Sequence, residues 1–172
     1  FVECVTIGAM EFIRATEEDL TEIIRIFLSC WHIAYVDVLA EEVRTAMDEK
    51  AARALWETSF VNSDRDTFLV KDGSSNVAVF RTGIDPEEEN TWHLFSLYVD
   101  PICAGRGIGG AVMKEFFEAG KKKDKSRYSL WVFASNAPAK GLYLKNGFRP
   151  SGRTRIRDSW GEVEEELVKV DI

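Results

Sequence analysis

The sequence has few of the residues from which disulfide frameworks and metal centres are built. Its 172 residues include three cysteines and two histidines. Cys4, Cys30 and Cys103 are an odd number at irregular spacings, which favours neither a disulfide framework nor a zinc site. His32 and His93 are far apart in the sequence, so we expect no metal cofactor. Free thiols are typical of a reducing compartment, and we expect a cytoplasmic protein.

Positive charge and long apolar runs are also scarce. The chain carries 22 Lys and Arg residues against 29 Asp and Glu residues, a formal net charge of -7 at pH 7. Nucleic-acid binding needs a basic surface, so we expect no nucleic-acid partner. No stretch approaches the roughly 20 apolar residues of a membrane-spanning helix, and we expect no membrane partner. An acidic chain is better suited to a cationic small molecule or peptide.

The apolar residues that are present suffice for one domain. Hydrophobic residues make up 45% of the chain and aromatic residues 12%, and a chain of this length can bury a substantial core. We expect residues 10–172 to form a single domain, because no linker, repeat or low-complexity tract interrupts them. Residues 1–9 are interpreted as an upstream extension or a vector-derived segment, since Met10 would be a natural start.

The stretch 97–110 carries the most chemical information, because an apolar strand leads there into a glycine-rich turn and a helix. Its glycines lack the β-carbons that would keep a ligand away from the backbone. They are Gly105, Gly107, Gly109 and Gly110. Their N–H groups can converge on one anion, and the helix predicted for residues 108–122 directs its positive end toward the same place. The turn therefore predicts a diphosphate-binding cradle.

The same turn also matches the dinucleotide fingerprint G-x-G-x-x-G through Gly105, Gly107 and Gly110. That interpretation would make the protein a nicotinamide-dependent oxidoreductase. Its context is unfavourable, because residues 100–104 separate the strand from the glycines and the strand ending near Ser135 lacks a ribose-binding carboxylate. A P-loop is excluded because no Lys-Ser/Thr pair follows the glycines. Ordinary turn chemistry is the remaining alternative.

Hydrophobic periodicity and turn residues predict a mixture of strands and helices. Strands are predicted at residues 11–14, 67–71, 77–83, 92–99, 128–134, 148–157 and 162–170. Helices are predicted at residues 16–31, 41–56, 108–122 and 136–147. Because a helix separates strand 92–99 from strand 128–134, these two strands should run parallel.

With its elements in this order, the chain resembles the GNAT superfamily of N-acetyltransferases over residues 11–170. Two motifs carry the resemblance. One is Val99-Asp100-Pro101 followed by Gly105-Arg106-Gly107-Ile108-Gly109-Gly110, and the other is Asn136, Ala139, Leu142-Tyr143 and Asn146-Gly147-Phe148. The resemblance implies an α/β (α+β) fold: a mixed, mostly antiparallel six- to seven-stranded sheet with one splayed parallel pair, flanked by about four helices.

The resemblance also implies acetyl-CoA as cosubstrate, bound where the two parallel strands splay apart. The backbone of Tyr98 and Val99 would pair with the pantetheine arm, and Asn136 would bind its end. The pyrophosphate would be bound by the N–H groups of Gly105, Arg106, Gly107, Ile108, Gly109 and Gly110. Tyr143 would bring its hydroxyl to the thioester sulfur and donate a proton to the departing thiolate. Relatives usually carry Arg or Gln at Ala104, and we expect Arg106 to compensate.

An attacking amine must also lose a proton. His93 is our first candidate for the base, because imidazole titrates in the right range. Ser96, Asp37 and the acidic residues 87–89 are alternatives, as proton-relay or substrate-binding groups.

Acceptor selection is expected at three places: the connection 31–37, the turn 85–90 and the hairpin 153–160. Trp31, Tyr35 and Asp37 are our candidate substrate-binding residues, and Asp158 and Trp160 could join them. Acidic and aromatic side chains there could bind a cationic amine through charge and cation–π contact.

The prediction is therefore an N-acetyltransferase that transfers an acetyl group from acetyl-CoA to a primary amine of a small molecule or peptide. The amine would attack directly in a ternary complex. The alternative is a non-catalytic CoA- or acetyl-CoA-binding sensor or interaction domain. The final hairpin would leave a sheet edge that a second copy could cover, so a homodimer is one arrangement open to the chain.

Overall fold

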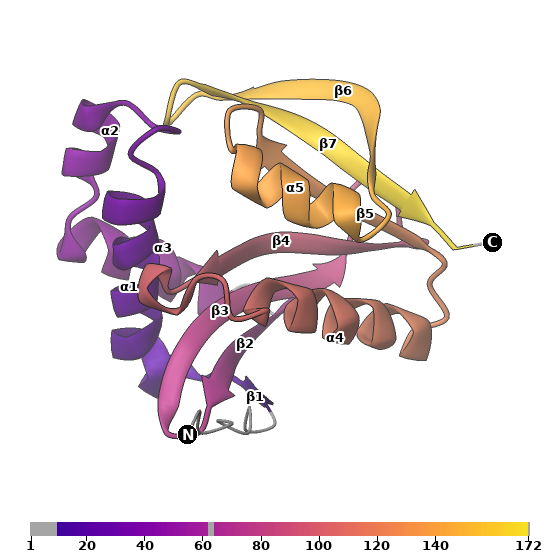
Figure 1. The fold of residues 1–172 in the computed structure, drawn as a ribbon, viewed down its shortest axis with the longest axis horizontal. Helices are drawn as coiled ribbons and strands as arrows, with labels where there is room; N and C mark the ends of the chain where they lie inside the picture. The colour runs from indigo at the N-terminus through magenta and orange to yellow at the C-terminus, as the bar shows by residue number, and fades with distance from the viewer. Residues whose placement is uncertain (1–9, 62–63, 172) are drawn as a thin grey trace, which may run out of the picture.

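The computed structural model describes residues 10–61 and 64–171, and the predicted extension 1–9 lies outside them. Its centre is one seven-stranded sheet with the strand order β1-β2-β3-β4-β5-β7-β6 (Figure 1). The strands are β1 (Glu11–Arg14), β2 (Arg65–Asp72), β3 (Ser75–Ile84), β4 (Thr91–Val99), β5 (Arg127–Phe133), β6 (Arg149–Arg157) and β7 (Glu162–Val170). Only β4 and β5 pair in parallel. The predicted fold class is confirmed.

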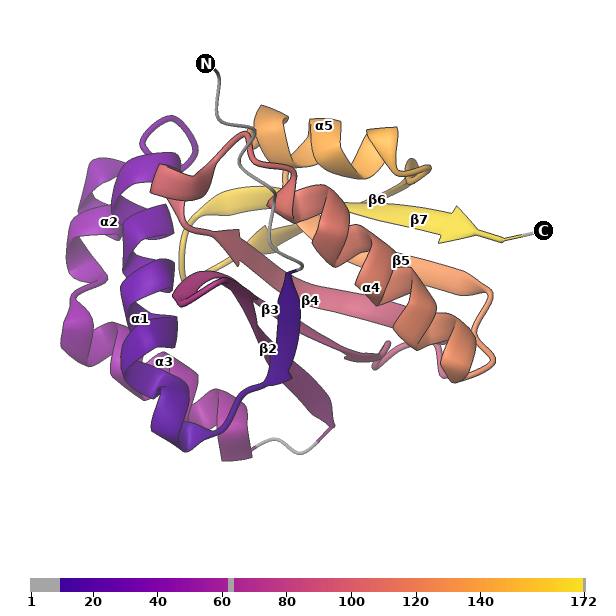
Figure 2. The same cartoon turned by 60° about the horizontal axis from the view of Figure 1, so that its bottom comes forward.

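Five α-helices accompany the sheet in the described part of the chain. They are α1 (Leu20–Ser29), α2 (Glu41–Ala46), α3 (Glu49–Val61), α4 (Ile108–Lys122) and α5 (Ala137–Lys145). Figure 1 shows α4 and α5 in front of the sheet and α1, α2 and α3 grouped at the left, an arrangement that Figure 2 shows from a second side.

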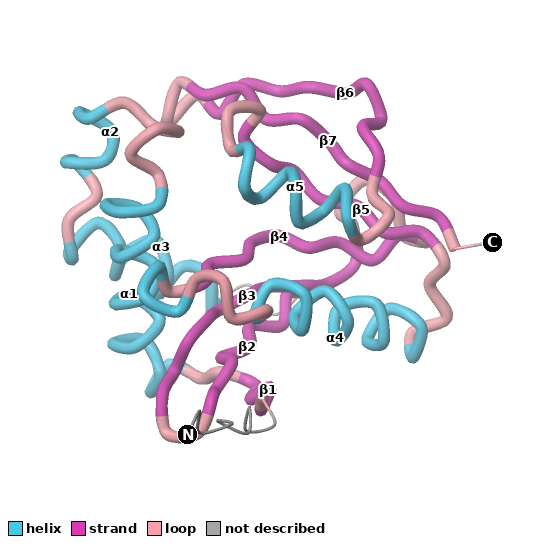
Figure 3. Tube along the Cα trace, in the orientation of Figure 1, coloured by secondary structure: helices cyan, strands magenta, loops and turns pink. Residues whose placement is uncertain are grey.

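The predicted helix 41–56 is two helices, which is why five helices stand where about four were expected. Figure 3 shows the loop between α2 and α3. The chain leaves helical geometry at Met47, and Asp48 Oδ1 then accepts a hydrogen bond from the Ala51 N–H at 2.8 Å, which caps the start of α3. The buried residues of α3 are Ala52 and Trp56, whereas Ala54 and Leu55 are exposed.

The helix α1 ends in a π-helical turn at Cys30–Ala34, in which the Tyr35 N–H donates to the Cys30 carbonyl oxygen at 3.0 Å. Such π-helical turns are rare in proteins, and many of those that occur lie at functional sites. Trp31 is fully buried within it, whereas Tyr35 lies close to Tyr98 of β4, with ring centroids 6.4 Å apart.

Two apolar cores cover the two faces of the sheet. The first lies under α4 and α5 and contains Val112, Met113, Phe116, Tyr128 and Phe148. The second lies under α1 and α3 and contains Ile23, Phe27, Trp31, Trp56 and Val79. Alternate residues of the central strands enter the two cores, as the period of a β-strand requires.

The strand β6 forms one edge of the sheet and is exposed along its whole length. An exposed edge strand is a surface on which another strand can pair. The homodimer suggested for this edge stays a prediction.

Candidate active site

The parallel strands β4 and β5 are paired along only part of their length. The ladder joins Thr91–Leu94 to Arg127–Leu130, and no described residue of β5 pairs with β4 beyond Leu94. On its other side β4 stays paired with β3 as far as Val99. The two strands therefore splay apart as predicted, and the β5-facing edge of β4 is left without ladder partners.

Phe95 is the extra residue of a β-bulge at the start of the splay, because Arg81 and Thr82 of β3 face Ser96 and Leu94. A bulge bends the strand and redirects the side chains near it. His93 and Phe95 are two residues apart and lie on the same side of the strand, with ring centroids 4.6 Å apart.

A cavity of about 460 Å³, which we call the glycine-loop cavity, lies where the splay meets the N-terminus of α4. It is lined by nine of the ten predicted cofactor-binding residues: Tyr98, Val99, Gly105, Gly107, Ile108, Gly109, Gly110, Asn136 and Tyr143. The tenth, Arg106, is exposed and lines a neighbouring cavity together with Arg25 and Asp100. The Ala104 position also lines the glycine-loop cavity.

The backbone of this cavity fits a diphosphate. Gly105 and Gly107 have φ angles of +79° and +78°, a region that residues with side chains rarely adopt. A β-carbon at Gly105, Gly107 or Gly110 would meet nothing within 4 Å, so a ligand can approach the backbone there. Within the described residues, no acceptor is found for the N–H groups of residues 105–110, and the first bond of α4 runs from Ala111 to Gly107. These donors, at a helix N-terminus, are suited to an anion.

Asn136 and Tyr143 are both positioned by α5. The Asn136 Oδ1 accepts the Ala139 N–H at 3.3 Å and caps the helix. Tyr143, two turns later, is only 7% exposed. Burial raises the pKa of Tyr143 above the ordinary tyrosine value, so its phenol stays protonated.

A smaller cavity of about 80 Å³ continues from the glycine-loop cavity into the splay, and we call it the junction cavity. Tyr35, Tyr98, Asn136 and Tyr143 line both cavities. The burial of Tyr35 raises its pKa well above the ordinary value, so this residue too presents a neutral phenol.

A third cavity, of about 150 Å³, contains His93 and is called the histidine cavity. Phe95, Trp131, Arg157 and Glu164 line both this cavity and the junction cavity. The three cavities thus follow one another from the glycine-rich turn, through the splay, to the histidine.

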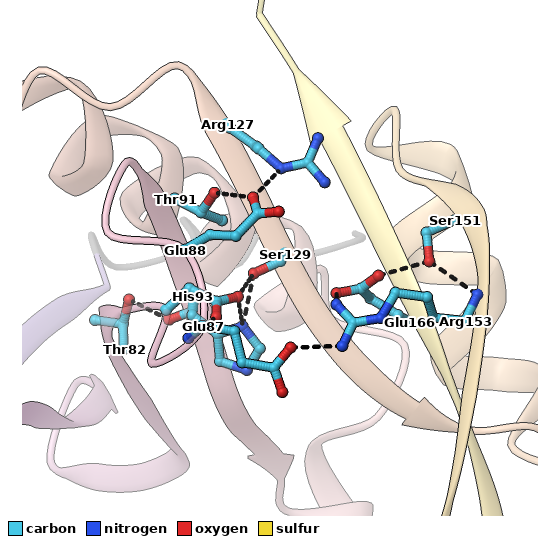
Figure 4. Close-up of polar contacts among 11 residues, drawn as sticks. Thr82, Glu87, Glu88, Thr91, His93, Arg127, Ser129, Ser151, Arg153 and Glu166 are labelled. Carbon is cyan, nitrogen blue, oxygen red and sulfur yellow. Dashed lines mark hydrogen bonds and ion pairs between the residues drawn. The ribbon is translucent and has the colours of Figure 1, made fainter.

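His93 is fixed by a hydrogen-bonded group of buried residues. Its Nδ1 lies 2.7 Å from Ser129 Oγ and 3.1 Å from Asp85 Oδ2, and Ser129 Oγ donates to Asp85 Oδ2 at 2.5 Å. Figure 4 shows His93 and Ser129 directed toward each other. Because Ser129 gives its hydrogen to Asp85, both neighbours of Nδ1 act as acceptors and Nδ1 carries the ring hydrogen. The Nε2 atom is then the basic nitrogen.

Asp85 stays ionised in this group. Burial acts to raise its pKa, but hydrogen bonds from His93, Ser129 and the Glu87 N–H outweigh burial and hold the pKa well below the ordinary aspartate range. A fixed carboxylate on Nδ1 determines the tautomer and the orientation of the imidazole.

Carboxylates and arginines surround the histidine cavity. Arg153 bridges Glu87 and Glu166, as Figure 4 shows, and Glu166 also accepts from Ser151 Oγ at 2.6 Å. Glu164 is buried on β7 and pairs with Arg155 at 2.5 Å.

The other predicted site residues lie in varied places. Trp31 is fully buried against Phe27 and lines none of the three cavities. Asp37 is exposed and lines none of them either. Ser96 lines the junction cavity, and its Oγ is buried without a hydrogen-bond partner in the described part of the chain.

Sequence reasoning missed Glu164, Arg65 and the pairing of His93 with Ser129. Glu164 and Glu166 alternate along β7, a pattern that places both on one face. The pattern does not say that this face is the buried one. His93 and Ser129 are opposite each other in the parallel register of β4 and β5, which no short motif specifies.

The described residues thus combine a splayed parallel strand pair, a glycine-rich turn and a buried tyrosine. Residues 17–148 match the model of the acetyltransferase (GNAT) family, and the chain belongs to this family. That assignment makes the chain an acyltransferase and removes the oxidoreductase alternative.

Relatives are consistent with the family. A candidate [ribosomal protein bS18]-alanine N-acetyltransferase of Bacillus subtilis is 39% identical over 57 residues, 33% of this chain and 38% of that protein. The candidate phosphinothricin acetyltransferase YwnH of the same organism is 26% identical over 124 residues, 69% of this chain and 76% of that protein. This chain therefore spans less than half of the first relative and about three quarters of the second.

Among solved structures, the PaiA N-acetyltransferase of Thermoplasma acidophilum in complex with coenzyme A superposes with a TM-score of 0.75. The match covers 95% of this chain and 99% of that chain at 20% sequence identity, and it shows the shared fold. Among the helices of residues 10–61 and 64–171, none has the length and apolar character that crossing a bilayer requires.

Proposed function

We propose that this chain transfers an acetyl group from acetyl-CoA to a primary amine, by direct attack while both substrates are bound. One observation carries the proposal: Tyr143 borders both the glycine-loop cavity and the junction cavity. A cofactor bound along the first cavity would therefore end at a protonated phenol, beside the space in which an acceptor could enter. A solved relative in complex with coenzyme A supports the choice of cofactor.

The glycine-rich turn and β4 would hold the cofactor. The N–H groups of residues 105–110 and the positive end of α4 suit its diphosphate. The β5-facing edge of β4 from Phe95 to Val99 offers backbone groups to an extended pantetheine arm. Bound acetyl-CoA supplies a thioester whose carbonyl carbon is open to an amine.

Two side chains would handle protons. Tyr143 keeps its hydroxyl hydrogen because it is buried, and can donate it to the thiolate that leaves. His93 lines the histidine cavity, and its Nδ1 is fixed by Asp85. Its Nε2 can accept the proton of the ammonium group directly or through water.

The acceptor would enter from the histidine cavity, which joins the junction cavity through Trp131 and Glu164. The names of two relatives point to acceptors of different size, an alanine of a ribosomal protein and the small molecule phosphinothricin. A small molecule or a peptide amine is therefore the proposed acceptor class.

A thiol-release assay with acetyl-CoA tests the proposal over a panel of amino acids, polyamines, aminoglycosides and peptide N-termini. We expect release of CoA that depends on one acceptor class, together with CoA binding by calorimetry. Tight CoA binding with no release across the panel would instead favour the alternative of a CoA-binding sensor. If the protein neither binds CoA nor releases it from acetyl-CoA, both the acetyltransferase and the sensor are excluded.

A further inference from the structure

In the histidine cavity the carboxylates have partners within the protein, whereas one arginine has none among the described residues. Its carboxylates all have partners: Asp85 is held by His93 and Ser129, and Glu164 by Arg155. Glu87 and Glu166 share Arg153, as described above. Each acidic side chain of the cavity therefore has at least one ion-pair or hydrogen-bond partner within the protein.

Arg65 is different. It lines the same cavity, yet its side chain forms no ion pair or hydrogen bond with any residue in 10–61 or 64–171. Its guanidinium carbon lies 3.9 Å above the Phe95 ring. Burial lowers the pKa of Arg65, and the neighbouring charge of Arg157 lowers it further, against a smaller opposing effect of Asp64.

Arg157 is only loosely neutralised. It is 3.7 Å from Glu164, whose closer partner is Arg155, and its guanidinium carbon stacks 4.5 Å from the Trp160 ring. Arg65 and Arg157 therefore bring two positive charges to one cavity. Arg65 has no carboxylate partner among the described residues, and Arg157 shares Glu164 with Arg155. Such an arrangement is stabilised when an anion enters.

The fold keeps this platform in place. Gly83 of β3 is opposite Arg65 of β2 in the register. A β-carbon at Gly83 would lie 2.6 Å from the Asp64 carbonyl oxygen and 3.3 Å from the Phe95 ring. Glycine at this position leaves room for the Phe95 ring, over which the Arg65 guanidinium lies.

We propose that Arg65 and Arg157 bind an anionic group of the acceptor, which makes the acceptor a small zwitterion: a primary amine that also carries a carboxylate or phosphonate. This inference rests on the proposed acetyltransferase function and specifies its acceptor. The amine would then face Glu164 and His93, which line the same cavity.

Size and charge distinguish this class from its rivals. The histidine cavity has a volume of about 150 Å³, similar to a cavity that holds one benzene molecule, so the part of the acceptor that it holds is small. A polyamine would bring a second cation toward Arg65 and Arg157. A peptide N-terminus has no anionic group next to its amine, because its first carboxyl carbon is in an amide bond.

The test compares acceptors with and without the anion. Glycine, L-alanine and 2-aminoethylphosphonate are measured against glycinamide, alanine methyl ester, spermidine and a tripeptide amide. We expect kcat/KM to be at least about tenfold higher for one of the anionic acceptors than for its uncharged analogue. An uncharged acceptor, polyamine or tripeptide that is preferred over every anionic one would overturn the inference while leaving the acetyltransferase function intact.

The second part of the test uses Arg65→Met, which keeps an apolar stem over Phe95, and Arg65→Lys, which keeps a charge. Arg14→Met is the matched control, because Arg14 also pairs with β2 but lies away from the cavity. Arg65→Met should raise KM for the anionic acceptor about tenfold with little change in kcat. Arg65→Lys should raise KM by less, and Arg14→Met should change neither KM nor kcat. An equal loss for charged and uncharged acceptors would contradict the proposal.

Binding is measured separately by calorimetry, with CoA already bound and glycine or 2-aminoethylphosphonate as the probe. Binding that Arg65→Met weakens supports the inference even where turnover is slow. If CoA binds and neither probe binds nor reacts, the anion site is refuted. If CoA itself does not bind, the proposed function fails as well, so the two failures are distinguished.

Discussion

Asp85 Oδ2 lies 3.1 Å from Nδ1 of His93, and the two residues flank the turn that joins β3 to β4. The Asp85 N–H donates to the Thr91 carbonyl oxygen at 2.9 Å, which closes this turn. This short segment thus places the Asp85 carboxylate next to Nδ1 of His93, and His93 itself lines the histidine cavity. A residue positioned in this way can act as a base.

The first prediction concerns this pair. His93→Gln should lower kcat by about 10²- to 10⁴-fold, the range of general base catalysis. Asp85→Asn should lower kcat less, by about 10- to 100-fold, because it acts through the histidine. Steady-state kinetics from pH 5 to 9 measure both. Unchanged kcat in His93→Gln would exclude the histidine as the base.

The second prediction follows from the pKa of Asp85. Hydrogen bonds lower this pKa in the folded state below the unfolded value of about 3.9. The group therefore stabilises the fold above pH 4, and the contribution is lost as the pH falls toward the folded-state pKa. Wild type should melt at a higher temperature than Asp85→Asn at pH 7, with a smaller difference at pH 3. A difference that grows toward acid would reverse the assigned sign.

The third prediction tests the acid role of Tyr143. Tyr143→Phe should reduce kcat by about 10²-fold or more while KM for acetyl-CoA stays within about twofold. Because burial raises the pKa of this phenol above 10, the ratio of wild-type to variant kcat should stay constant between pH 7 and 10. A ratio that collapses above pH 9 would mean that the phenol ionises there.

A fourth prediction separates ligand binding from helix stability. Gly110 lies in α4 and Gly141 in α5, and a β-carbon at either would meet nothing within 4 Å. Replacing glycine by alanine in a helix stabilises it by up to about 1 kcal/mol. Gly110→Ala should therefore keep or raise the melting temperature but weaken CoA binding about tenfold, since Gly110 lines the glycine-loop cavity. Gly141→Ala is the control, and equal CoA affinity in both variants would argue against the cradle.

The fifth prediction concerns packing between α4 and β5. A β-carbon on Gly120 would lie 2.6 Å from Tyr128 Cε1 and 3.1 Å from Trp92 Cδ1. Both rings are buried in the core under α4. Gly120→Ala should destabilise the protein by about 1–3 kcal/mol, as overpacking does, and chemical denaturation would measure the loss. Wild-type stability would show that the rings can move aside.

Most of the residues that line the glycine-loop cavity could be predicted, because they are close together in the sequence. The glycines of residues 105–110 form the turn through their own backbone, and Asn136 caps the helix that follows it directly. Both features are therefore local and visible in the sequence. The acceptor side was predicted less fully. Residue type alone points to Trp31, Tyr35 and Asp37. Of these, only Tyr35 lines one of the three cavities described above, and Trp31, in the turn at Cys30–Ala34, is buried in the core.

The sequence by itself determined the order of strands and helices, the parallel pair and the glycine-rich cradle, because each depends on local propensity or on the spacing of neighbouring residues. Only the tertiary structure decided that Asp85, His93 and Ser129 form one group and that Arg65 approaches Arg157. These residues come from separate strands, and the register between strands follows from how the whole sheet packs against two cores.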